Sequence, residues 1–283
     1  MIRRRHDTAA PVRRFGWRRQ LAGCRALVTG ASSGVGRAIA LELCRRGARV
    51  VATGRRGDRL ATLADEAAGL AGGPLAYEAG DITSPDFRSS LVATAVAKLG
   101  GLDLLVAAAG GGAIGRFGDA SPDTLAAIMD VDFFAPAELV RVALPALRDG
   151  RDPAIVLVGS ILGHHPLPLH AEYCAAKAAL TSLAGSLRLE LAADGIGVLL
   201  ASLGPTESEF WNHLLTGQRP AWSRGRAMPA ARTARIVVRA IAWRRREVFP
   251  GWQAKGFVCA ARLFPRLVDR VMMRRMRRSP PPP

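Results

Sequence analysis

Apolar residues along this chain follow two alternating patterns. Short β-type runs, such as the one at residues 155–158, are followed by longer stretches in which apolar residues recur at helical spacing. The runs predict strands near residues 25–29, 49–53, 75–78, 103–107, 154–159, 196–202 and 247–249. The periodic stretches predict helices near residues 34–46, 58–71, 86–98, 122–147, 172–193 and 232–243, with another over 255–277. This alternation predicts a doubly wound α/β fold, a three-layer sandwich in which helices cover both faces of a parallel sheet of about seven strands.

A glycine-rich turn joins the first predicted strand to the first predicted helix. Gly30, Gly34 and Gly36 lie in the sequence Thr-Gly-Ala-Ser-Ser-Gly-Val-Gly, directly after the first apolar run. Glycines permit unusual backbone angles and close approach of a ligand, and the amides and dipole at a helix start attract phosphate groups. Strand, turn and helix together indicate a site for the pyrophosphate of a dinucleotide.

A tyrosine and a lysine one helical turn apart provide a second signal. The chain has only two tyrosines and three lysines, its other basic side chains being mostly arginine, yet Tyr173 precedes Lys177 by four positions in a predicted helix. This spacing places phenol and ammonium on one face. A nearby ammonium lowers the pKa of the tyrosine, which suits a general acid or base near neutral pH. The alternative is an exposed tyrosine beside a solvated lysine.

The two signals together resemble the short-chain dehydrogenase/reductase family, whose members carry Thr-Gly-x-x-x-Gly-x-Gly early and Tyr-x-x-x-Lys about 140 residues later. The resemblance covers residues 21–210 and implies a Rossmann-type fold. It also implies a catalytic serine thirteen residues before the tyrosine, and Ser160 stands there. Tyr173 would then exchange a proton with the substrate oxygen and Ser160 would donate a hydrogen bond to it. Lys177 would lower the tyrosine pKa and contact the cofactor ribose.

The resemblance also implies the cofactor contacts. The matching positions are Thr29, Gly30, Ser32, Ser33, Gly34, Val35, Gly36, Arg55, Asp81, Ile82, Ala108, Gly110, Gly204 and Ser208, together with Tyr173 and Lys177. No acid stands at the end of the second predicted strand, where NAD-binding proteins hold the ribose hydroxyls, and the Arg55 guanidinium suits a phosphate. We therefore expect NADP(H) to be preferred over NAD(H). The alternative is that Arg55 reflects only the arginine-rich composition.

Three positions depart from the family pattern. Asp132 replaces the catalytic asparagine, and we expect its charge to pair with Lys177 and to offset part of the effect of Lys177 on Tyr173. The segment 107–110 lacks the usual asparagine amides beside the cofactor, and Leu203 replaces a proline after the sixth strand. These departures leave open a catalytically weak or inactive relative, a dinucleotide-binding protein with a regulatory or scaffolding role.

Positive charge is concentrated at the two ends of the chain. The formal net charge is +17, and residues 1–20 and 262–278 each carry seven arginines and one aspartate. We expect a flexible basic arm over 1–20, a catalytic domain over 21–252, and a basic amphipathic helix with a proline tail over 253–283. Four isolated cysteines indicate neither disulfides nor a zinc site, so we expect no bound metal and a cytoplasmic location. No signal peptide and no apolar run of about 18 residues is apparent.

Residues 207–231 are expected to form the substrate loop. Their large apolar side chains, with His213 among them, suggest an apolar ketone, aldehyde or alcohol as substrate, although packing of the loop onto the sheet explains them equally well. These side chains are Phe210, Trp211, Leu214, Leu215 and Trp222. His164, His165 and His170 are interpreted as loop residues near the mouth of the site.

Arginines recur every four residues near the C-terminus. Arg262, Arg266, Arg270 and Arg274 are interspersed with apolar residues, which predicts an amphipathic basic helix despite Pro265. Such a helix can lie on the inner face of an anionic membrane, or it can dock on its own domain or on a sister subunit. No nucleic-acid recognition motif accompanies the charge, so nucleic acid is not expected as a partner. The family resemblance implies a homodimer or homotetramer.

Overall fold

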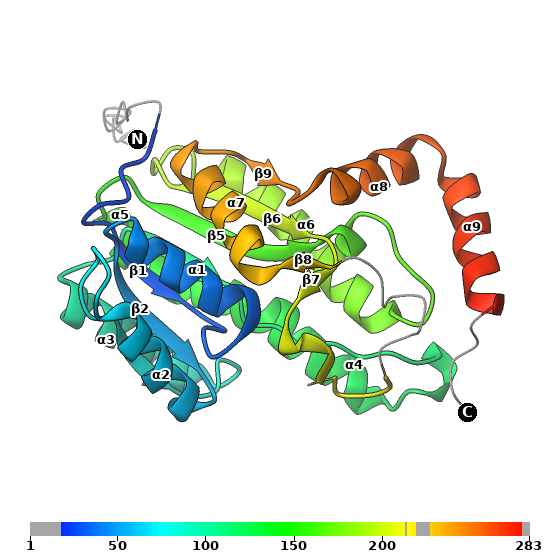
Figure 1. The fold of residues 1–283 in the computed structure, drawn as a ribbon, viewed down its shortest axis with the longest axis horizontal. Coiled ribbons are helices and arrows are strands. Elements are labelled where there is room, and N and C mark those ends of the chain that lie inside the picture. Colours follow the sequence, from blue (N-terminus) through cyan, green and yellow to red (C-terminus); the bar gives the residue numbers. More distant parts are fainter. Residues whose placement is uncertain (1–17, 213, 219–226, 279–283) are drawn as a thin grey trace, which may run out of the picture.

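Seven parallel strands form a central sheet with helices on both faces (Figure 1). The computed structural model describes residues 18–212, 214–218 and 227–278. The strands of this sheet are β1 (Arg25–Val28), β2 (Arg49–Gly54), β3 (Ala76–Ala79), β4 (Leu104–Ala107), β5 (Ala154–Ser160), β6 (Gly197–Leu203) and β9 (Glu247–Val248). Their spatial order, β3-β2-β1-β4-β5-β6-β9, confirms the predicted doubly wound, Rossmann-type α/β fold.

Two apolar clusters hold the three layers together. Helices α1 (Gly34–Arg45), α2 (Gly57–Ala67) and α7 (Ala230–Ala242) pack on one face of the sheet. Helices α3 (Pro85–Leu99), α5 (Ala135–Arg148) and α6 (Ala171–Glu190) pack on the other. Neighbouring strand residues such as Leu27 and Val28 face opposite clusters. Both faces are therefore buried, which explains why the strands read as continuous apolar runs instead of alternating ones.

The helix predicted over 122–147 contains a wide turn at its centre. Helix α4 (Pro122–Met129) passes into the π-helical turn η2 (Asp130–Phe134), which leads directly into α5. A π-turn inserts one extra residue into a helix, and such turns recur at functional sites. Asp132 lies in the middle of this turn.

The flexible arm predicted over residues 1–20 includes residues that are packed in the structure. Arg19 is buried, and its guanidinium donates hydrogen bonds to Asp152 and to the carbonyl oxygens of Pro153 and Ile241. Residues 18–20 therefore belong to the domain, because their contacts come from segments far away along the chain. The rest of the predicted arm, residues 1–17, lies outside the described residues.

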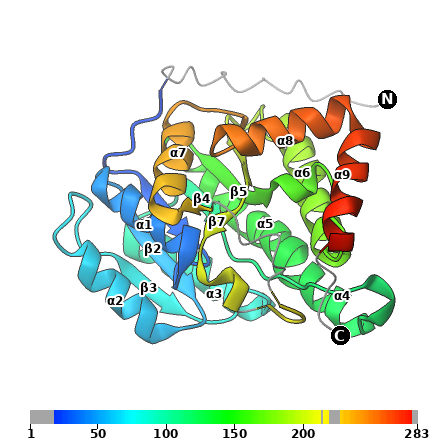
Figure 2. The same cartoon turned by 45° about the vertical axis from the view of Figure 1, so that its right-hand side comes forward.

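The predicted C-terminal helix forms two helices, α8 (Trp252–Leu263) and α9 (Pro265–Arg278). Phe264 between them has φ −133° and ψ 57°, outside the helical region. Proline cannot donate the backbone hydrogen bond of a helix interior but is tolerated at a first helical position, so Pro265 ends one helix and begins the next. Both helices lie apart from α1, α2 and α3 in the two views (Figures 1 and 2).

Two very short strands close the base of the predicted substrate loop. Strand β7 (Thr206–Glu207) pairs with β8 (Met228–Pro229), and this second sheet was not predicted. Short 3-10 helices are η1 (Phe117–Asp119), η3 (Ile161–Gly163) and η4 (Glu209–Asn212). Among the described residues, no helix has both the length and the hydropathy needed to cross a membrane.

Candidate active site

The glycine turn between β1 and α1 is packed so closely that only glycine fits at two of its positions. Gly30 and Gly34 have φ of 66° and 56°, in the left-handed region. A Cβ atom at Gly30 would lie 2.7 Å from the carbonyl oxygen of Ala108, and one at Gly36 would collide with the backbone of Gly30. The turn therefore allows β1, β4 and the start of α1 to approach closely, as a dinucleotide site of this type requires.

The start of α1 has the features of an anion site. Ser33, at the N-cap, makes no side-chain capping bond, and the first turn contains no acidic residue. Amides at a helix start without such partners are well placed to bind phosphate oxygens. Together with the glycine cradle, these amides fit the pyrophosphate of a nicotinamide dinucleotide.

Thr29 braces the loop that follows β4. Its hydroxyl is buried and accepts hydrogen bonds from the amides of Ala108 and Ala109, each at 3.1 Å. The segment 107–110 lacks the asparagine amides common in the family, and Thr29 supplies bonds that hold its backbone in place. The sequence pointed to Thr29 only as a cofactor residue and gave no sign of this long-range contact.

Ser160, Tyr173 and Lys177 come together at the carboxyl end of β5. Ser160 is the last residue of β5, and Tyr173 and Lys177 lie one turn apart in α6. Ser160 is near enough to Tyr173 to act on its phenol, whose pKa it lowers. The Lys177 ammonium lies 5.7 Å from the centre of the Tyr173 ring and donates to the carbonyl oxygen of Val158. The three predicted catalytic side chains therefore form one cluster.

Asp132 pairs with Lys177, as the sequence predicted. The Asp132 side chain is completely buried, and its Oδ1 lies 3.1 Å from the Lys177 Nζ. The same oxygen accepts a hydrogen bond from the amide of Gly111 at 3.1 Å. A Cβ atom at Gly110 would lie 2.6 Å from this oxygen, so a glycine is needed there. Oδ2 has no hydrogen-bond partner among the described residues.

The pair shifts the pKa values of the neighbouring groups. Burial alone would lower the pKa of Lys177, but Asp132 and Tyr173 outweigh it, so the pKa of Lys177 is raised. Burial raises the pKa of Tyr173, and Asp132 raises it further, against the opposing effects of Lys177 and Ser160. The expected net lowering of the tyrosine pKa is therefore wrong. Its phenol is protonated at neutral pH and can serve as an acid.

The residues that follow β2 carry positive charge. Arg55 is exposed, and its charge helps to lower the pKa of Asp81. The Asp81 carboxylate accepts bonds from the amide and hydroxyl of Thr83, which fixes its turn, and Ile82 is buried beside it. The neighbouring Arg56 was not predicted; it lies 2.7 Å from a carboxylate oxygen of Glu209.

The start of the predicted substrate loop lies over these cofactor and catalytic residues. Ser208 lies close to Gly34, and the Phe210 ring is in edge contact with the Tyr173 ring, with 5.7 Å between centroids. Glu209, between them, holds Arg56. Further along, the amide of Leu215 donates to the carbonyl of Gly112 at 2.8 Å. His213 and Trp222 lie outside the described residues.

Two of the predicted loop histidines connect the site to the C-terminal part. His164 contacts Ser202 on β6 and Glu247 on β9 at 2.9 Å and 3.1 Å. His165 lies 3.1 Å from Asp269 on α9. His170, in contrast, is buried at the start of α6 and bonds to the carbonyl of Pro168. These contacts hold the segment between Ser160 and Tyr173 in place.

Gly204 and α8 form another close contact near the site. A Cβ atom at Gly204 would lie 3.1 Å from the Cβ of Ala254, so the end of β6 packs on α8.

In the described ranges, histidine, cysteine and acidic side chains form no group of three or more that could hold a metal ion.

Comparisons with known proteins agree with this geometry. A sequence profile described as short chain dehydrogenase matches residues 25–219. The chain is 34% identical over 248 residues to a hydroxysteroid 11-beta-dehydrogenase 1-like protein of Macaca fascicularis, covering 87% of this chain and 85% of that protein.

Two solved structures show the same fold. One is a short chain dehydrogenase/reductase from Burkholderia phymatum in complex with NAD, with a TM-score of 0.79, 24% identity and coverage of 88% of this chain and 96% of that one. The other is an alcohol dehydrogenase from the archaeon Thermococcus sibiricus complexed with 5-hydroxy-NADP, with a TM-score of 0.71, 21% identity and coverage of 79% and 94%. At these identities the two structures support the fold alone.

Proposed function

Because this chain belongs to the short-chain dehydrogenase/reductase family and is an NAD(P)-dependent oxidoreductase, we propose that it uses NADPH to reduce the carbonyl group of an apolar ketone or aldehyde. The observation that carries the proposal is the cluster of Ser160, Tyr173 and Lys177 at the carboxyl end of β5. A nicotinamide dinucleotide whose pyrophosphate is bound at the glycine turn would supply the hydride.

The side chains of the cluster supply the proton, the hydrogen bond and the fixed charge that the reaction needs. Tyr173 donates its phenolic proton to the carbonyl oxygen, and Ser160 donates a hydrogen bond that stabilises the negative charge developing on that oxygen. Lys177 supplies a fixed positive charge next to the phenol. Asp132 keeps that ammonium protonated and oriented, since both groups are buried and the pKa of Lys177 is raised.

Preference for NADPH over NADH rests on the end of β2. Two adjacent arginines, Arg55 and Arg56, follow the strand. The end of the strand carries no acid that could hold free ribose hydroxyls. A guanidinium binds phosphate oxygens through paired hydrogen bonds. Arg55 is exposed and able to reach a ligand, whereas Arg56 already contacts Glu209. We therefore assign the ribose phosphate mainly to Arg55.

An apolar substrate is supported by the side chains over Tyr173. Phe210 contacts the Tyr173 ring, and Trp211 packs against Phe210 with 5.4 Å between centroids. A carbonyl placed at the Tyr173 hydroxyl would meet these aromatic faces. The relative from Macaca fascicularis carries hydroxysteroid in its name, and we propose a flat, steroid-like or aromatic ketone for this chain as well.

The test is NADPH oxidation by the purified chain across a panel of keto-steroids, aromatic ketones and aliphatic aldehydes, with NADH in parallel and a sugar aldehyde as polar control. We expect turnover with apolar ketones and NADPH. Arg55→Gln should raise the KM for NADPH on the order of ten-fold and leave that for NADH unchanged. Tight NADPH binding with no turnover across the panel would instead favour the regulatory or scaffolding alternative.

A second candidate function is contact with an anionic membrane surface on the cytoplasmic side. Six large apolar side chains are exposed on α8, α9 and the link between them: Trp252, Leu263, Phe264, Leu267, Val271 and Met273. Exposed arginines lie among them, and Asp269, the acid of α9, is engaged by His165. Apolar side chains flanked by arginine are suited to the interface of an anionic bilayer.

Sedimentation with lipid vesicles tests this second function. The full chain should co-sediment with vesicles that contain phosphatidylserine, but not with pure phosphatidylcholine, and Leu267→Glu should abolish the effect. If vesicles fail to bind while light scattering shows that Leu267→Glu dissociates a dimer or tetramer, the surface belongs to a sister subunit, as the predicted homo-oligomer would require.

A further inference from the structure

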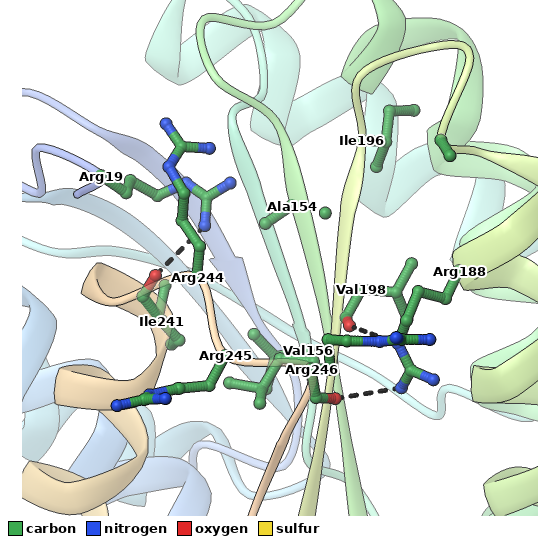
Figure 3. A pocket seen from close by; sticks show the side chains of 13 residues that line it. Arg19, Ala154, Val156, Arg188, Ile196, Val198, Ile241, Arg244, Arg245 and Arg246 are labelled. Carbon is green, nitrogen blue, oxygen red and sulfur yellow. Dashed lines mark hydrogen bonds between the residues drawn. The ribbon is translucent and has the colours of Figure 1, made fainter. Parts of the chain in front are cut away.

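A hollow lined by five arginines lies beside the first residues of β5 and β6 (Figure 3). It has a volume of about 230 Å³, and we call it the arginine notch. The arginines are Arg19, Arg188, Arg244, Arg245 and Arg246. Ala154, the first residue of β5, lines it, whereas Ser160 ends the same strand. Six residues of strand separate the two sites by about 20 Å.

The notch exists because the last strand of the sheet is short. Strand β9 pairs with β6 only at Leu200 and Ala201, so the first residues of β6 pair with β5 on one side but have no strand on the other. Arg188 partly covers this open edge. Its side chain donates to the carbonyl oxygen of Val198 at 3.3 Å and to that of Arg246 at 3.0 Å (Figure 3).

Positive charge in the notch exceeds the negative charge near it. No aspartate or glutamate is among its lining residues. Asp152, just outside, is shared by Arg19 and Arg244. Glu247, the next acid in reach of Arg188, already bonds to Ser202 and His164. Even if both carboxylates are counted against the five guanidiniums, three positive charges remain.

Two of these guanidiniums are close to each other. The side chains of Arg188 and Arg246 run toward one another, whereas Arg245 points to the other side of the strand (Figure 3). Burial lowers the pKa of Arg188, and the charge of Arg246 lowers it further. Among the described residues, neither Arg188, Arg245 nor Arg246 forms an ion pair. An anion placed between Arg188 and Arg246 would relieve their repulsion.

The notch also has an apolar lining, which favours a ligand with both an anionic and an apolar part. Ala192, Ile196 and Val198 line it beside Arg188, so a ligand would meet a guanidinium at one end and hydrocarbon at the other. Planar guanidiniums bind carboxylates and phosphates through two parallel hydrogen bonds. The volume is below the roughly 300–1,000 Å³ of most small-molecule pockets, so the ligand must be compact.

We propose that the arginine notch is a binding site for a compact organic anion, a carboxylate or a phosphate monoester with a short apolar body, separate from the catalytic site. The anionic group would bind Arg188 and Arg246, and the apolar body would cover Ile196 and Val198. This assignment does not depend on the substrate or the cofactor preference of the enzyme.

Calorimetric titration of the full chain tests this site, with hexanoate and phenyl phosphate as probes and hexanol and inorganic phosphate as controls. A saturating dinucleotide is present, so that phosphate binding at the glycine turn does not contribute. We expect one saturable site for each probe and markedly weaker binding of both controls, because each control lacks one of the two contacts. Absence of saturable probe binding would overturn the proposal and leave the arginines as charges that protect an open strand edge.

Three variants locate the site. Arg246→Gln should weaken both probes on the order of ten-fold, since its exposed side chain makes a charge-assisted contact with the ligand but no hydrogen bond needed by the fold. Ala192→Leu, at the exposed edge of the notch, should weaken them by narrowing the space beside Ile196 and Val198 without changing charge. Arg235→Gln, an exposed arginine of α7 outside the notch, is the matched control. Equal effects of Arg235→Gln and Arg246→Gln, or no effect of Ala192→Leu, would contradict a site in the notch.

Discussion

The two ends of strand β5 differ in how far nearby carboxylates balance the positive charge beside them. At the carboxyl end, beside Ser160, the single ammonium of Lys177 is buried and faces the carboxylate of Asp132 at 3.1 Å. At the amino end, beside Ala154, five arginines surround a hollow without an acid in its lining. A buried charge needs a partner because water is excluded, and buried Arg19 accordingly pairs with Asp152, whereas the exposed Arg245 and Arg246 keep their hydration. The charge at the carboxyl end is thus fully paired, whereas the charge at the amino end is paired only in part, through Asp152.

The largest effect should come from removing the phenolic proton at the carboxyl end. Tyr173→Phe should lower kcat of NADPH-dependent reduction by about 100- to 10,000-fold, the usual contribution of a general acid. Dinucleotide binding, measured by fluorescence titration, should stay within about two-fold because the ring remains. Tyr77→Phe, the other tyrosine of the chain and exposed on β3, is the control and should retain full activity.

Breaking the buried ion pair of Asp132 with Lys177 should strongly reduce the stability of the fold. Asp132→Ala leaves Lys177 buried without its carboxylate, which should lower the free energy of unfolding by about 3–5 kcal/mol. The pKa of Lys177 is raised in the folded state, so the contribution of the ammonium is present at pH 7 and is lost only as pH rises through the folded pKa, above the ordinary value of about 10.4. Burial raises the pKa of Asp132 against the pull of Lys177, so the carboxyl contributes in the opposite direction. Urea unfolding at pH 7 measures it. A loss below 1 kcal/mol would mean that the pair is not a buried charge pair in solution.

Close packing at the carboxyl end can be separated from backbone conformation by two matched substitutions. Gly30 and Gly23 have similar φ, 66° and 71°, but a Cβ atom would strike the β4 loop only at Gly30, since nothing lies within 4 Å at Gly23. Gly23→Ala should therefore cost about 1 kcal/mol for the left-handed backbone alone. Gly30→Ala should cost about 1–3 kcal/mol more and abolish dinucleotide binding. Equal losses in thermal unfolding would show that the turn relaxes.

The smallest expected change in stability is at the amino end of β5, and it should be a gain instead of a loss. Arg246→Gln removes a charge that repels Arg188, so stability in low salt should rise by a few tenths of a kcal/mol, and the gain should vanish in high salt. Arg235→Gln is the control for general charge reduction. Destabilisation by Arg246→Gln at low salt would indicate that the arginines of the notch are already compensated.

Much of the catalytic end could be predicted from the sequence because its residues are set by local spacing. The glycine turn, the Tyr173–Lys177 repeat and Ser160 at the end of an apolar run are each determined within one element and its adjacent turn. A parallel sheet then brings the carboxyl ends of its strands to one edge. Residue type and spacing were therefore enough to indicate the glycine turn and the Tyr173–Lys177 pair, whereas Ser160 and Asp132 were predicted through the family resemblance that these motifs carry.

The contacts that were not predicted join segments far apart in the chain. The bonds from the amides of Ala108 and Ala109 to Thr29, and the ion pair of Arg56 with Glu209, depend on how loops pack across the site. Burial of Arg19 and the arginine notch depend on the short pairing of β9 with β6. In an arginine-rich chain, no local pattern distinguishes these arginines from solvated ones.

The net direction of the Tyr173 pKa was predicted wrongly for a related reason. The spacing of Tyr173 and Lys177 indicated a lowered pKa, and Lys177 does act in that direction. Burial of the phenol, to which Asp132 from the π-turn adds, outweighs that effect. The degree of burial is a property of the packed structure and could not be read from the spacing.

The pH dependence of NADPH-dependent reduction, measured on wild-type protein and Asp132→Asn, tests most directly the claim that the buried pair controls the proton of Tyr173. Reduction requires a protonated phenol, so the rate should fall as pH rises through the Tyr173 pKa. Because Asp132 raises that pKa, its neutral replacement should move this fall to lower pH while activity at neutral pH persists. Superimposable profiles with equal rates would contradict the claim.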